Sequence, residues 1–111
     1  MMINGAFVVN RWAKPIEIVN KSGVFDRGVW IETETTNYDM AAVFRFDGNK
    51  YPEYEHLNLS TEDITVYSTN NICNIEDVVI VNSTRYKVLV KKDYTRNSNF
   101  FMYIAKREPI Q

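Results

Sequence analysis

The sequence predicts an all-β protein, a small antiparallel β barrel or sandwich of about six to seven strands. Composition is the first reason: Val (12) and Ile (10) far outnumber Leu (3), and Tyr and Phe are abundant. Such side chains suit the pleated, half-buried surface of a sheet. Apolar and polar residues also alternate along most of the chain, between short polar breaks typical of turns. At 111 residues the chain is long enough for one domain with one modest core.

The N-terminal part is predicted to differ from the rest. We expect residues 1–27 to form an extended, loop-rich arm with a first strand, and residues 28–108 to form the antiparallel β domain. Gly5–Val9 can form a short strand, and Ile16 and Ile18 have the spacing of a brief edge strand. Residues that favour loops come after the first strand, namely Pro15, Gly23 and Gly28.

Two strand patterns follow the arm. Residues 28–36 alternate so that Trp30, Glu32 and Glu34 share one face, which we expect to be largely solvated. Residues 37–46 continue the period of two, with a mainly apolar face made of Tyr38, Met40, Ala42, Phe44 and Phe46.

The segment from residue 50 to residue 60 has no clear period. It follows a turn at Asp47–Asn49. Pro52 suits the first turn of a short helix over Glu53–Leu57. An irregular loop rich in tyrosine and carboxylate side chains fits the sequence equally well.

The last third of the chain predicts an antiparallel meander. Strands are expected at residues 64–68, 77–81, 84–92 and 100–105, and Asn82-Ser83 has the length of a tight hairpin turn. The last strand is apolar on both faces, which predicts a central strand or one that covers a partner. Its two faces consist of Phe100, Met102 and Ile104, and of Phe101, Tyr103 and Ala105.

No group of residues indicates catalysis or a cofactor. The single cysteine, Cys73, excludes an internal disulfide and leaves the redox compartment open. We interpret it as a structural thiol, because the only histidine, His56, lies in an unrelated segment. The glycines are isolated, and one Cys with one His disfavours a zinc site. The first residues lack the pattern of a signal peptide, and no apolar run approaches the ~20 residues of a membrane span.

The net charge of −1 conceals an uneven distribution. Residues 31–63 carry eight acidic and two basic groups, whereas residues 85–107 carry seven basic groups and one acidic group. These opposite charges either meet within one subunit, meet between copies, or are simply solvated. A nucleic-acid binder is usually basic overall, with its charge on one face.

Two function classes therefore remain open on the residues alone. A small single-stranded nucleic-acid-binding barrel would use aromatic side chains among the basic ones to stack bases, here Tyr86, Tyr94, Phe100, Phe101 and Tyr103. The same aromatics at strand spacing also suit a core, and the acidic middle interrupts a basic groove. A domain that binds a protein partner by strand addition is the other class.

Several short motifs occur in a characteristic order between residues 28 and 106. They are Gly28-Val29-Trp30, Val66-Tyr67-Ser68-Thr69, Asp77-Val78-Val79-Ile80 with Tyr86-Lys87-Val88, and Phe100-Phe101-Met102-Tyr103-Ile104-Ala105. In this order they resemble the neck proteins of tailed bacteriophages, the head–tail joining (head closure or tail completion) proteins. Asn82 stands where that family usually has a turn glycine, and Asn tolerates the positive φ of such a turn. Residues 47–62 carry no signature of the family.

The resemblance implies a structural, non-catalytic virion protein without a cofactor, assembled in the host cytoplasm and located in the phage neck. Six or twelve copies would form a ring between the portal vertex and the tail. Portal, adaptor or tail proteins would be its neighbours, double-stranded DNA would pass without sequence-specific binding, and no membrane is involved.

Such a ring uses two different patches of each subunit. The acidic segment of one copy would face the basic segment of the next, or would line the DNA channel and repel phosphates. The candidate interface residues are Phe7, Trp12, Trp30, Glu32, Glu34, Lys87 and Lys91. The candidates for a loop toward the lumen or the next ring are Tyr51, Glu53, Tyr54, Glu55 and His56.

Overall fold

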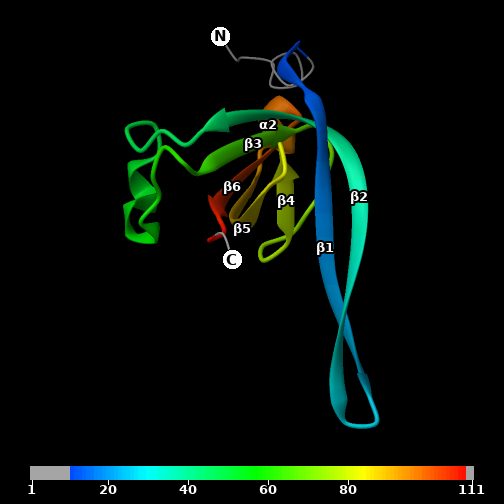
Figure 1. The fold of residues 1–111 in the computed structure, drawn as a ribbon. Coiled ribbons are helices and arrows are strands. Elements are labelled where there is room, and N and C mark those ends of the chain that lie inside the picture. The colour runs from blue at the N-terminus through cyan, green and yellow to red at the C-terminus, as the bar shows by residue number, and fades with distance from the viewer. Residues whose placement is uncertain (1–10, 110–111) are drawn as a thin grey trace.

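Six antiparallel strands close into a barrel in the order β1-β2-β3-β6-β5-β4 (Figure 1). This architecture is that of a computed structural model, which describes residues 11–109. The strands are β1 (Lys14–Asp26), β2 (Val29–Arg45), β3 (Ile64–Ser68), β4 (Val78–Val81), β5 (Thr84–Asp93) and β6 (Phe101–Arg107). A 3-10 helix, η1 (Pro52–Leu57), and a single helical turn, α2 (Thr95–Ser98), lie in the connections. The prediction of a small all-β barrel is confirmed.

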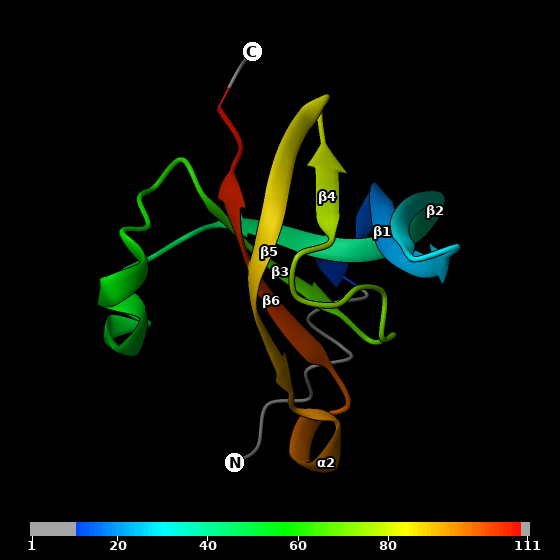
Figure 2. The same cartoon turned by 90° about the horizontal axis from the view of Figure 1, so that it is seen from below.

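The barrel is built from two three-stranded meanders, β1-β2-β3 and β4-β5-β6. One seam joins β3 to β6 over five residue pairs. The other seam is shorter, because β1 pairs with β4 only from Glu17 to Val19. Figure 2, which looks from below, shows β5 and β6 crossing the barrel next to this short closing strand β4.

The N-terminal strand departs from the prediction. Residues 14–26 form one strand of 13 residues instead of a loop-rich arm with a brief edge strand. This strand pairs with β2 along its whole length and also with β4. Gly23, interpreted as a loop residue, lies within it and faces the ring of Trp30 from β2. The predicted strand at Gly5–Val9 lies outside the described residues.

Strands β1 and β2 continue far beyond the barrel as a two-stranded hairpin (Figure 1). Residues 20–37, called the arm from here on, pair only with each other. The chain reverses at Arg27 and Gly28, whose φ angles of 53° and 78° are both positive. Two such residues define the primed turns that match the twist of a hairpin. The arm gives the molecule its elongated shape, with extents of 55 × 27 × 26 Å.

The main core fills the barrel. Its side chains come from all six strands, and Ile72 and Cys73 of the β3–β4 loop close one end. A second, smaller cluster lies on the outer face of β6, where η1 and the residues around it cover Met102 and Ile104. Both faces of β6 are therefore buried, which confirms the prediction of a central strand.

The meander has the predicted turns. Asn82 and Ser83 both have positive φ, 51° and 66°, so the β4–β5 hairpin is tight. Between residues 50 and 60 the helical alternative is correct, in the form of the 3-10 helix η1 that starts at Pro52. The two strand patterns expected at residues 28–36 and 37–46 are one continuous strand, β2.

Candidate functional site

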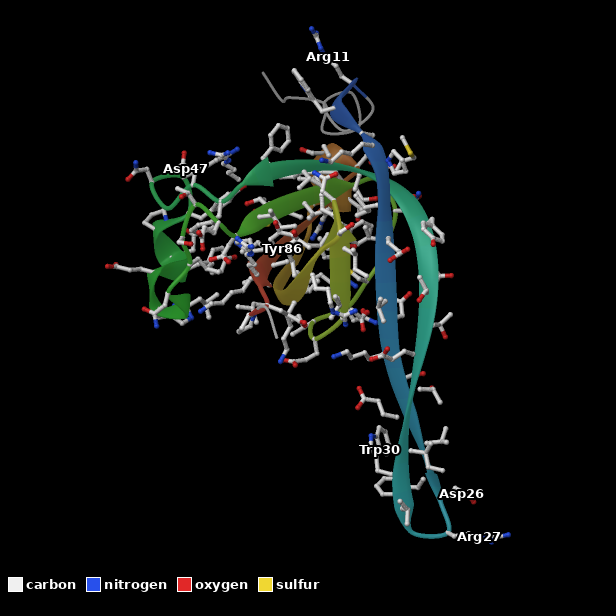
Figure 3. The ribbon with its side chains drawn as sticks, viewed as in Figure 1. Arg11, Asp26, Arg27, Trp30, Asp47 and Tyr86 are labelled. Carbon is white, nitrogen blue, oxygen red and sulfur yellow. The ribbon has the colours of Figure 1, made fainter. Side chains whose placement is uncertain are left out.

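The tip of the arm is the most exposed apolar part of the described chain. Five large hydrophobic side chains gather there, called the tip cluster: Val24, Phe25, Val29, Trp30 and Ile31. Phe25 is 75% exposed and Trp30 is 55% exposed. The cluster occupies both faces of the ribbon, because Phe25 pairs with Trp30 on one face and Val24 with Ile31 on the other. Figure 3 shows Trp30 beside the turn at Asp26 and Arg27, far from the barrel.

Trp30 is held in a defined position at the tip. Its ring meets that of Phe25 edge to face, with the centroids 5.0 Å apart. The same ring lies over Gly23, where a Cβ atom would come within 2.1 Å of the Trp30 Cζ2 atom. Only glycine leaves room for this ring. The aromatic pair is thus preorganised while it remains open to solvent.

The stem between the tip and the barrel is polar. Ser22 and Thr33 share a hydroxyl–hydroxyl hydrogen bond of 2.9 Å across the two strands. Nearer the barrel, the Asn37 side-chain amide donates to Asn20 Oδ1 at 2.8 Å. Glu32 and Glu34 are exposed on the face that also carries Trp30, and Lys21 lies opposite Glu34. These cross-strand pairs hold the ribbon together outside the barrel.

The root of the arm is fixed by one buried carboxylate. Asp77 is 3% exposed. It accepts hydrogen bonds from the Lys21 backbone N–H at 2.9 Å and from the Asn20 side-chain amide at 3.0 Å. It also accepts from the Asn74 backbone N–H at 2.8 Å. The carboxylate therefore joins the start of the arm to the loop that closes the barrel.

A second exposed apolar surface lies where β2 meets the barrel. We call Tyr38, Met40 and Phe44 the base patch; they are 72%, 50% and 39% exposed. All three point outward, because Ala41 and Val43, which alternate with them, contact the barrel core. Pro15 of β1 is exposed directly opposite Met40 and extends the patch.

The structure brings some predicted interface residues together and separates others. Trp30, Glu32 and Glu34 lie along one face of the arm. Lys87 and Lys91 lie on β5 and contact partners in their own subunit: Lys87 forms a 2.7 Å ion pair with Glu76. Lys91 Nζ donates to the side-chain oxygens of Asn71 and Asn74. Trp12 is exposed ahead of β1, and Phe7 lies outside the described residues.

The residues predicted for a loop toward the lumen divide into two groups. Tyr51 and Tyr54 pack on the outer cluster of the barrel, and the hydroxyls of Tyr51 and Tyr67 are hydrogen-bonded. Burial and this contact raise the pKa of Tyr51. The three polar members, Glu53, Glu55 and His56, are exposed on η1. This polar group is the more exposed of the two.

Sequence reasoning missed most of the tip cluster and the whole base patch. Phe25 and Ile31 were not recognised as candidates, nor were Tyr38 and Met40. The available signal was Gly28, a residue that readily adopts the positive φ of a hairpin turn, between two alternating segments. Placing the hairpin there puts the neighbouring apolar residues at its tip, where no core can cover them.

The single cysteine and the single histidine lie in different environments of this fold. Cys73 is buried in the barrel core, and burial, with the nearby Asp77 carboxylate, raises its thiol pKa to about 12. His56 is exposed on η1, so the two residues are not a catalytic pair. Across residues 11–109, no three metal-binding side chains gather into a group that would hold an ion. No helix in this described range is long and apolar enough to span a membrane.

The fold and its arm define the class of protein: a closed six-stranded antiparallel barrel with a projecting β hairpin. No protein-family model matches the sequence, and no curated protein sequence is significantly similar to it. Among solved structures, the chain is similar to the solution structure of protein SF1141 from Shigella flexneri 2a, with a TM-score of 0.65. The match covers 87% of this chain and 93% of that chain at 12% sequence identity. At this identity the similarity shows a shared fold alone.

Proposed function

We propose that this protein is a non-catalytic structural subunit of the neck of a tailed bacteriophage, where identical copies form a ring between head and tail. The order of the short motifs between residues 28 and 106 supports this assignment by resemblance. The main support for a role in assembly is the arm. It exposes the tip cluster at the end of a two-stranded ribbon that pairs with no third strand.

An isolated ribbon of this kind needs a neighbour. A two-stranded hairpin is at best marginally stable in water. Both of its outer edges also present unpaired backbone groups, which favour contact with another chain. An aromatic side chain can bury about 150–250 Å² of surface. Since Phe25 is 75% exposed and Trp30 is 55% exposed, the two side chains together expose roughly 200–300 Å² of aromatic surface. Exposed apolar surface of this size, concentrated at one end of a molecule, is typical of an interaction site.

The charge distribution supports a ring of identical copies. The exposed glutamates of the arm, Glu32 and Glu34, lie on a different part of the molecule from the lysines of β5. In a ring the two patches of a heterologous interface meet once per subunit boundary. The acidic groups of η1, Glu53 and Glu55, are exposed and would repel the phosphates of DNA passing through the channel.

The free strand edges of the arm favour a second candidate function. An extended segment of an unrelated protein could add to the edge of β1 or β2, as in other complexes formed by strand addition. This function needs no ring. Binding of single-stranded nucleic acid has less support, because the aromatics proposed to stack bases are all packed against one of the two cores, and Tyr103 is fully buried.

Mass measurement tests the proposal directly. We expect native mass spectrometry and analytical ultracentrifugation of the purified protein at high concentration to show assemblies of six or twelve copies. Rings should be visible by electron microscopy. A protein that stays monomeric under these conditions, and that is absent from purified phage particles, would contradict the neck assignment. Tight, salt-sensitive binding of labelled single-stranded DNA would favour the nucleic-acid alternative.

A further inference from the structure

Residues 47–62, called the cover segment from here on, leave the barrel and return to it at the same place. They connect the end of β2 to the start of β3. The two ends are joined by a hydrogen bond of 2.9 Å from the Phe46 backbone N–H to the Asp63 carbonyl. Figure 2 shows η1 to one side of the strands. A loop whose ends lie together can move without separating the strands that it connects.

The cover segment forms its own backbone hydrogen bonds. The Tyr54 N–H donates to the Tyr51 carbonyl at 3.2 Å, and the Asn58 N–H donates to the Glu55 carbonyl at 3.2 Å. None of the six residues of η1 is buried. A hollow of about 340 Å³ also lies between residues 58–62 of the segment and residues 106–109 at the end of β6. The segment is therefore only loosely packed against the barrel.

Side chains hold the cover segment over the outer cluster. Tyr54 packs with this cluster, which includes the fully buried Met102 and Ile104 of β6. The hydroxyls of Tyr51 and Tyr67 form a hydrogen bond of 2.5 Å that joins the segment to β3. This bond is the direct polar link between the cover segment and the strand beneath it.

The outer face of β3 contains a buried hydroxyl group without a hydrogen-bond partner. Thr65 lies in register between Phe44 of β2 and Ile104 of β6, and it is 2% exposed. Its Oγ1 atom finds no partner among the described residues. Burial of an unpaired hydroxyl is unfavourable. The closed arrangement is therefore penalised at Thr65, and access of water to this face would remove the penalty.

We propose that the cover segment is a lid, which opens as one unit from the outer face of β3 and β6 while the barrel stays closed, and that the Tyr51–Tyr67 hydrogen bond holds it shut. Opening leaves the main core intact, so it requires less free energy than unfolding of the barrel. The lid belongs to the single subunit. It goes beyond the proposed ring and does not depend on it.

Two neighbouring residues on opposite faces of β3 provide the test. Thr65→Cys places a thiol under the lid, and Val66→Cys places one in the main core, each in a Cys73→Ala background. With a thiol reagent under native conditions, we expect Thr65→Cys to be labelled at least about tenfold faster than Val66→Cys. Urea denaturation of both variants gives the labelling rate that unfolding of the barrel alone would allow.

The role of the hydroxyl pair is tested by adding Tyr51→Phe to each cysteine variant. Loss of the Tyr51 hydroxyl should accelerate the labelling of Thr65→Cys at least about threefold and leave that of Val66→Cys unchanged. Tyr86→Phe is the matched control, because Tyr86 packs against the main core and not under the lid. It should not change the difference between the two cysteines.

Proteolysis of the wild type tests the lid without a cysteine variant. Chymotrypsin should cleave after Tyr54 at least about tenfold faster than after Tyr103 of β6, because cleavage follows the population of the open form. The two fragments should remain together as a folded barrel.

Three outcomes would overturn the proposal. The first is labelling of Thr65→Cys only at the rate of global unfolding, and the second is labelling at the rate of a free thiol, which would mean that no lid covers this face. The third is cleavage after Tyr54 that is no faster than cleavage after Tyr103. Equal acceleration of both cysteines by Tyr51→Phe would show that the hydroxyl pair stabilises the whole barrel and does not hold the lid.

Discussion

The Asp77 carboxylate accepts a hydrogen bond of 2.9 Å from the backbone N–H of Lys21, and this contact fixes the arm at the point where it leaves the barrel. Asp77 is nearly inaccessible to solvent, and its second oxygen accepts from Asn20 and from the Asn74 backbone. Its own backbone carbonyl accepts from the Val88 N–H of β5. One residue thus connects the arm, the loop that closes the barrel, and β5.

We predict that Asp77→Ala lowers the free energy of unfolding by about 2–4 kcal/mol, because several donors lose a charged acceptor in a buried site. Chemical denaturation measures this loss. Glu62→Ala is a suitable control: its side chain is exposed, so the change should stay within about 0.5 kcal/mol. Equal stability of the two variants would show that Asp77 does not anchor the arm.

The position of Trp30 over Gly23 gives a second prediction. A Cβ at residue 23 would lie 2.1 Å from the indole ring, so Gly23→Ala must displace Trp30. We expect amide hydrogen exchange in the arm to accelerate at least about tenfold while the barrel keeps its protection, since the arm opens locally.

Gly48→Ala is the matched control for this experiment. The added methyl group would meet only Phe46, at 3.8 Å, which is an ordinary contact. Its exchange profile should match that of the wild type. Retention of arm protection in Gly23→Ala would mean that the aromatic pair does not hold the tip.

The sequence predicted the barrel better than the arm, and the reason is physical. The strands from residue 64 onward alternate between a core and a second environment, so period and burial agree, and Asn82-Ser83 is a clear turn signal. In the arm neither face is buried. The alternation of residues in the arm therefore gave no information about a core. Gly23 was interpreted as a loop residue, although it lies in a strand and leaves room for the Trp30 ring.

The candidate site was only partly predictable for a related reason. Trp30, Glu32 and Glu34 could be recognised because they share a face by simple alternation. The base patch could not, since Tyr38, Met40 and Phe44 have the pattern of a buried strand face. Their exposure follows from closure of the barrel, which turns Ala41 and Val43 inward. Closure depends on strand pairing that is distant in sequence.

Alkaline pH should destabilise the protein through Cys73. Burial raises the folded thiol pKa from 9.0 to about 12, so the folded state keeps a proton that the unfolded state releases. The contribution of the protonated thiol to the free energy of unfolding is fully present below about pH 9, and it is lost as the pH rises toward about 12. Tyr103, whose pKa burial also raises to about 12, acts in the same direction above about pH 10.

Urea denaturation across this pH range measures the effect. The wild type should lose stability steadily above about pH 9, and Cys73→Ala should be less dependent on pH between about 9 and 10, where the thiol alone contributes. In the native protein at neutral pH, a thiol reagent should label Cys73 only as fast as the barrel opens. Rapid labelling without unfolding would contradict the buried site.

The lysines of β5 provide a test of the electrostatic part of assembly. Lys87 pairs with Glu76 in its own subunit, so it is not a wholly free charge, yet its side chain is 41% exposed. We predict that Lys87→Glu with Lys91→Glu weakens assembly severalfold while the monomer stays folded, because the reversed charges repel the acidic arm of a neighbour. Raising salt from about 0.1 M to about 1 M shortens the Debye length from about 10 Å to about 3 Å. This should weaken the association of the wild type and reduce the difference in association between the wild type and the double variant.

Sedimentation measures the association. A thermal melt checks the fold, since Lys91 also donates hydrogen bonds to Asn71 and Asn74. Arg96→Glu, exposed on α2 just beyond the end of β5, is a single charge-reversal control outside the strand. Assembly that is unchanged in the double variant would leave the apolar tip as the source of the contact and the charge asymmetry without a role in it.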